Sequence, residues 1–115
     1  MDNSVYENRF ITPKLQYVDE RELYADREYL LRMYPAKARI IMVLVENECD
    51  KLEYEGSLMF SLYPDKESML EIARGIYDKV KYNDTDEMLK QLIEVMLCNE
   101  FYVRRSRYKR RRKFF

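Results

Sequence analysis

The sequence predicts an all-α protein: a small three- to four-helix bundle with an irregular N-terminal arm and a basic C-terminal tail. Apolar residues recur at helical spacing over three long segments. Only two glycines and three prolines interrupt the 115 residues, too few for a series of hairpins. The length fits one domain, and 47% apolar with 37% charged residues is typical of a packed core under a solvated surface.

The N-terminal part of the chain has the weakest pattern. Residues 1–18 show no sustained period, and Thr12-Pro13 indicates extended backbone, so we expect an irregular arm. The bundle domain is then expected over residues 19–103. It begins with a looser helix at 19–33, whose inward-facing residues are predicted to be Leu23, Leu30 and Leu31.

A second helix is predicted over residues 35–53, because proline suits a first helical position. One stripe about 100° wide contains Ala38, Ile41, Met42, Val45, Cys49 and Leu52. Further apolar residues on its other sides, at Ile40, Val43 and Leu44, predict a central helix that others surround. A buried strand over residues 40–45 is the alternative, which the continuing period disfavours. Gly56 is expected to end this helix as a left-handed cap.

Two more helices complete the predicted bundle. The third, over residues 64–82, has the inner face Met69, Ile72, Ala73, Ile76, Tyr77 and Val80. The fourth, over residues 84–104, starts with a capping box formed by Asp84 and Glu87. Its buried face is predicted to contain Leu89, Leu92, Ile93, Met96, Leu97 and Phe101.

Charge is distributed very unevenly along this formally neutral chain. Residues 1–103 contain 13 Lys/Arg and 21 Asp/Glu, whereas residues 104–115 contain eight Lys/Arg and no acid. The molecule is therefore expected to have an acidic body and a cationic tail. The tail cations are Arg104, Arg105, Arg107, Lys109, Arg110, Arg111, Arg112 and Lys113.

The tail is the strongest candidate for function. Guanidinium groups bind phosphate oxygens, and rings can stack on unpaired bases. We expect the eight cations to contact a polyanion, RNA or DNA above all, with stacking or wedge residues at Tyr108, Phe114 and Phe115. An anionic membrane surface is a less favoured partner. A solvated tail that only aids solubility, or one that folds back on acidic residues, also fits the composition.

An acidic face is predicted on the second helix, where Glu46, Asp50 and Glu53 occur at i, i+4 and i+7 with Arg39 on the same side. Carboxylate pairs can hold a metal, but the chain has no histidine to complete a di-metal carboxylate pattern. We expect a solvated stripe with an Arg39 salt bridge, or a docking surface for the basic tail.

Catalytic motifs are missing. The sequence has no Gly-rich phosphate loop, no G-x-S-x-G and no histidine to activate a nucleophile, so we expect a non-enzymatic protein with no cofactor and no metal. Cys49 and Cys98 are expected to be buried thiols, and the apolar and acidic setting of Cys49 should raise its thiol pKa.

Two further patterns concern origin and location. No apolar run is long enough to span a membrane, and the polar start lacks the order of a signal peptide, which predicts a cytoplasmic protein. Tyr34-Pro35, Glu48-Cys49-Asp50, Tyr54-Glu55-Gly56-Ser57 and Tyr63-Pro64-Asp65, with the Arg-rich end, resemble short uncharacterised proteins of clostridia-type Gram-positive bacteria. The resemblance covers roughly residues 30–82 and the tail. It implies a bacterial, cytosolic origin and no activity or ligand.

The sequence therefore favours a small binding or adaptor protein whose tail engages a polyanion, above all nucleic acid in view of the arginine-aromatic pattern. The alternative is a self-assembling homo-oligomer, in which the basic tail of one copy binds the acidic body of the next.

Overall fold

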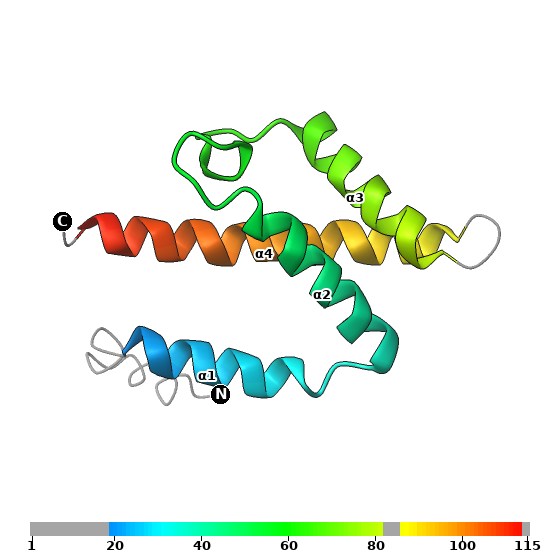
Figure 1. The fold of residues 1–115 in the computed structure, drawn as a ribbon, viewed down its shortest axis with the longest axis horizontal. Helices are drawn as coiled ribbons and strands as arrows, with labels where there is room; N and C mark the ends of the chain where they lie inside the picture. Colours follow the sequence, from blue (N-terminus) through cyan, green and yellow to red (C-terminus); the bar gives the residue numbers. More distant parts are fainter. Residues whose placement is uncertain (1–18, 82–85, 114–115) are drawn as a thin grey trace, which may run out of the picture. The chain divides into compact units, whose positions relative to one another are not determined.

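The computed structural model describes residues 19–81 and 86–113, and all their regular structure is helical (Figure 1). The elements are α1 (Glu20–Leu31), α2 (Ala36–Asp50), the short 3₁₀ helix η3 (Leu58–Phe60), α3 (Lys66–Val80) and α4 (Glu87–Lys113). The predicted all-α bundle is confirmed. Residues 40–45, for which a strand was the alternative, lie inside α2.

The chain divides into two compact units, Met1–Pro35 and Ala36–Phe115. The first contains α1, which begins after Asp19, whose carboxylate accepts a hydrogen bond from the Arg21 N–H. This hydrogen bond holds the pKa of Asp19 below its usual value. No side chain of α1 is buried: of the predicted inner face, Leu23 and Leu30 are exposed and Leu31 is half-buried. The predicted arm over residues 1–18 lies outside the described residues.

The second unit is built on α4, the longest helix, which contacts α2, α3 and η3 (Figure 1). Its core combines the predicted stripes of three helices with Met59 from η3. The buried apolar residues are Ile41, Met42, Val45, Cys49, Met59, Ala73, Ile76, Tyr77, Leu89, Ile93, Met96, Leu97 and Phe101.

Helix α2 is not the surrounded central helix that its composition predicts. Ile40 and Val43 are 58% and 55% exposed, because α3 and α4 cover only the face that contains Ile41 and Val45. Leu92, predicted on the buried face of α4, is also exposed. Apolar composition therefore indicated helices correctly but overstated how many of their faces are covered.

The segment after α2 is held by turns. The helix ends at Asp50, three residues before the predicted end, since the Leu52 and Glu53 N–H groups bond carbonyls only three residues back, at Cys49 and Asp50. Gly56 has the predicted positive φ, +91°. It does not cap α2; it occupies the third position of a turn closed by the Ser57 N–H and the Tyr54 carbonyl, where a type II turn requires positive φ.

Aspartates start the last two helices. The Asp65 carboxylate accepts from the Ser68 N–H at 3.0 Å, which begins α3 just after the predicted Pro64. At α4 the Asp86 carboxylate accepts from the Leu89 N–H at 3.1 Å, the bond that an N-cap residue makes. The predicted capping box placed this role on Asp84, which lies outside the described residues.

Within residues 19–81 and 86–113, no helix is both long and apolar enough to cross a bilayer.

The core stripe of α2 can be tested with two adjacent isoleucines. Replacing Ile41, which is 0% exposed, with alanine leaves a cavity, and we expect it to lower the unfolding free energy by about 3 kcal/mol. Ile40→Ala, one position away and 58% exposed, should change it by less than about 0.5 kcal/mol. Urea unfolding followed by circular dichroism measures both, and equal losses would contradict the assigned stripe.

Candidate functional site

The predicted basic tail is the last part of α4, which runs without a break from the bundle to Lys113. No glycine or proline interrupts residues 87–113, and leucine, methionine, arginine and lysine all favour helix. The boundary drawn at residue 103 therefore falls inside a helix. Phe114 and Phe115 lie outside the described residues, as do the side chains of Arg112 and Lys113.

Arg104 is enclosed by carboxylates from two helices. Its Nε donates to Glu100 Oε2 at 2.7 Å, one turn earlier on α4. Its Nη1 donates to Asp50 Oδ1 and to Glu53 Oε1, both at 2.8 Å, at the end of α2. The side chains of Arg104 and Glu100 are 10% and 1% exposed. These four residues, the Arg104 cluster, fix the end of α2 against the middle of α4.

The Arg104 cluster keeps its central charge. Burial alone would lower the pKa of Arg104, but the hydrogen bonds from Glu100, Asp50 and Glu53 outweigh it, so the pKa of Arg104 lies above its usual value. Three carboxylates face one guanidinium, and the outer two remain 67% and 43% exposed, which lets water solvate the excess negative charge. Arg104 is thus occupied by partners within its own chain.

Arg105 holds the connection between α2 and α3. Its Nη1 donates to the carbonyl oxygens of Met59, at 2.8 Å, and Ser61, and its Nη2 donates to the Leu62 carbonyl at 3.3 Å. These carbonyls belong to η3 and the residues that follow it, where the backbone has no continuing helix to bond. The Arg105 guanidinium supplies the missing donors.

Tyr108 is stacked on Phe60 of η3, with ring centroids 4.4 Å apart and an interplanar angle of 24°. This geometry is an offset-stacked aromatic contact. The ring that the sequence nominated for stacking on a base therefore already packs against a ring of the same chain. Together, Arg104, Arg105 and Tyr108 bind the segment from Asp50 to Leu62 along the side of α4.

The remaining described cations have a different environment. Arg107 is half-buried, and three consecutive residues on the following turn are exposed: Lys109, Arg110 and Arg111. The last acid on α4 is Glu100, so the helix beyond Tyr108 has no carboxylate of its own to neutralise these groups. We call residues 107–113 the basic extension.

The acidic face predicted on α2 splits into two parts. Asp50 and Glu53 belong to the Arg104 cluster, as the docking interpretation expected for a tail cation, while Glu46 is half-buried one turn earlier. Glu46 and Arg39 both have interacting partners. Within the described parts of the chain, no group of three potential metal ligands is close enough to hold an ion.

The two cysteines differ. Cys49 is 0% exposed, and burial raises the pKa of its thiol to about 12, in the predicted direction. Cys98 is exposed, which contradicts the expectation that both thiols are buried. The period of α4 explains this, since Cys98 follows Leu97 by one residue and points to another face of the helix.

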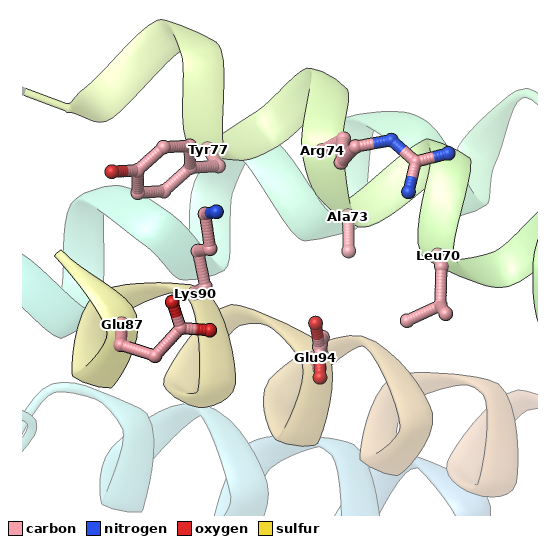
Figure 2. A pocket seen from close by; sticks show the side chains of 7 residues that line it. All are labelled: Leu70, Ala73, Arg74, Tyr77, Glu87, Lys90 and Glu94. Atoms are coloured by element: carbon pink, nitrogen blue, oxygen red, sulfur yellow. The ribbon is translucent and has the colours of Figure 1, made fainter. Parts of the chain in front are cut away.

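A hollow of about 180 Å³ lies between α3 and α4 (Figure 2). Lys90 reaches from α4 toward the ring of Tyr77, with its Nζ 5.2 Å from the ring centroid. Glu87, Glu94 and Arg74 line the same hollow. Because side chains of both signs and no orphaned buried polar group line it, the hollow does not define one class of ligand.

No family model, curated protein or solved structure matches this chain.

Removal of the Arg104 charge should lower stability much more than removal of a charge from the basic extension. Arg104→Leu removes the guanidinium that pairs with the buried carboxylate of Glu100, and we expect it to lower the unfolding free energy by about 3 kcal/mol. Arg110→Leu, on the exposed extension, should change it by less than about 0.5 kcal/mol. Adding Glu100→Leu to Arg104→Leu should restore most of the loss in a double-mutant cycle. Independent, additive losses in denaturant unfolding would show that the two groups are not coupled.

The cysteines predict selective labelling. At pH 8 iodoacetamide should modify Cys98 in the folded protein and leave Cys49 intact, because a thiol whose pKa is about 12 is almost entirely protonated and this one is also buried. The raised folded pKa makes the contribution of Cys49 to stability complete below its unfolded pKa, near 9. That contribution falls as the pH rises from 9 toward 12. Mass spectrometry of peptides measures the labelling, and equal modification of both thiols would contradict it.

Proposed function

We propose that this chain is a non-enzymatic binding protein whose basic extension engages a polyanion, with nucleic acid as the partner. The observation that carries the proposal is a helix that continues beyond its bundle with exposed cations at Lys109, Arg110 and Arg111 and no acid among them. Arg107 lies three positions before Arg110 and four before Arg111, and like charges this close on one helix face destabilise the helix. Phosphates would relieve this repulsion and release counterions on binding.

The contact set is narrower than the sequence suggests. Arg104, Arg105 and Tyr108 have partners in the bundle, so we assign phosphate contact to the basic extension alone. Without Tyr108 as a base-stacking ring, recognition rests on phosphates and should depend little on base sequence. We include a cytoplasmic location in the proposal, because the free thiols Cys49 and Cys98 suit a reducing compartment.

Binding of the tail to the acidic body of a neighbour is the weaker candidate. In that arrangement Asp50 and Glu53 would accept cations from a second copy. Both already bind Arg104 of their own chain at 2.8 Å, so an incoming tail would have to displace a buried guanidinium. An external polyanion would instead meet exposed cations at Lys109 and Arg110.

A salt series tests the proposal on the full chain. Fluorescence anisotropy of labelled single-stranded RNA should show binding that weakens steeply with salt. Each phosphate contact contributes about −0.7 to the slope of log K against log salt. Lys109→Gln/Arg110→Gln should therefore reduce the slope by about 1.4. Lys37→Gln/Lys66→Gln removes two exposed cations from α2 and α3 and should leave the slope unchanged.

A truncated chain tests the proposal only if it keeps the contacts that stabilise the bundle. A chain that ends at Val103 would lose the Arg104 cluster, whereas one that ends at Tyr108 keeps Arg104, Arg105 and the Phe60 stack. We expect the Tyr108-ended chain to fold and to lose RNA binding. Binding that survives this truncation, or no binding of the full chain at low salt, would refute the proposal. If the chain binds anionic vesicles in preference to RNA, the partner of the basic extension is a membrane surface and the nucleic-acid proposal is wrong.

A further inference from the structure

The outer face of α4 carries an apolar stripe that the other helices of the second unit do not cover. Four of its side chains are apolar or aromatic and from 41% to 77% exposed, and the fifth, Asn99, is also exposed. The stripe consists of Met88, Leu92, Val95, Asn99 and Tyr102. It lies opposite the core face, where Ile93 and Leu97 are buried. Helix α4 thus has two apolar faces, one that packs in the core and one that is exposed on the opposite side.

The spacing of this stripe is specific. Its members are separated by four, three, four and three residues, the alternation of a and d positions in a coiled coil. Leu92 and Asn99 fall at a positions, and Met88, Val95 and Tyr102 fall at d positions. From Met88 to Tyr102 the stripe is roughly 21 Å long, at 1.5 Å per residue.

We infer that this stripe, the α4 seam, is the contact between two copies of the chain, with their α4 helices antiparallel. Charge decides the orientation. A parallel pair would set the seven cations of residues 105–113 beside the same seven of the partner. An antiparallel pair sets the basic extension of each copy beside the acidic start of the other, where Asp86 and Glu87 lie.

A two-fold axis near residue 97 aligns the a and d positions of the two seams. Leu92 then faces the partner's Tyr102, and Val95 faces the partner's Asn99. Each contact occurs twice, as a two-fold interface requires. The pairing does not use the Arg104 cluster. Its orientation depends on the basic extension, which is also the proposed polyanion contact, but the apolar contacts of the seam do not depend on the proposed function.

Sedimentation equilibrium of the full chain at about 1 M salt tests the pairing, because charge interactions are screened beyond about 3 Å there and tail-on-body association would dissolve. We expect a dimer that persists. Leu92→Glu/Val95→Glu should weaken it by about 100-fold or more, since each copy would bring two carboxylates into the seam. Ile40→Glu/Val43→Glu, on the similarly exposed outer face of α2, should leave it intact.

Three results would overturn the inference: a monomer at all concentrations, a dimer that the α2 variant breaks and the α4 variant does not, or a dimer that neither variant weakens. Circular dichroism and thermal unfolding check that both variants, which alter exposed positions, keep the fold.

Cross-linking tests the orientation. Leu92→Cys and Tyr102→Cys are each made in a chain that carries Cys98→Ser, so that Cys49 is the other thiol and is buried. Under mild oxidation a mixture of the two variants should form disulfide dimers, and neither variant alone should. Efficient cross-linking of each variant with itself would indicate parallel helices and overturn the antiparallel assignment.

Discussion

One guanidinium, that of Arg104, connects the parts of the second unit that lie far apart in sequence. It bonds Glu100 within α4 and Asp50 and Glu53 at the end of α2. Glu100 is 1% exposed and pairs with Arg104 one turn later on the same helix. The bonds from Arg104 to Asp50 and Glu53 then fix the position at which the end of α2 meets α4. Arg105 and Tyr108, which follow Arg104 on α4, contact residues of η3 and hold it against the helix. The basic extension starts where these contacts end.

Helix positions were predictable because they depend on local spacing. The stripes containing Ile41 and Val45 on α2, and Ile93 and Leu97 on α4, are buried as the period indicates. Helix ends were less predictable, since neighbouring aspartates compete for the same capping role and turns can replace the last helical residues. Whether the outer faces of α2 and α4 are covered was not predictable from one chain, because the exposed residues Ile40 and Val95 are of the same types as residues in the core.

The site was predicted in outline and misjudged in detail. The charge distribution identified the cluster of cations, and residue spacing identified Asp50 and Glu53. Neither pattern reveals that Arg104 bonds directly to Asp50, which lies 54 positions earlier in the sequence. One signal was present. Glu100 and Arg104 both continue the buried stripe of Ile93 and Leu97 on α4, and an acid followed four residues later by a base on an apolar stripe indicates a buried pair. Reading the tail as a separate segment hid this continuity.

The long sequence separation of these contacts also affects how the chain acquires its structure during synthesis. Asp50, Met59 and Phe60 are made well before their partners Arg104, Arg105 and Tyr108. Until the ribosome has released that part of α4, the α2–η3 segment can form local helix and turns but has nothing to close against. A stall in translation between residues 80 and 104, after α3 has been made, would therefore leave the buried faces of α2 and α3 open to chaperones and to other nascent chains.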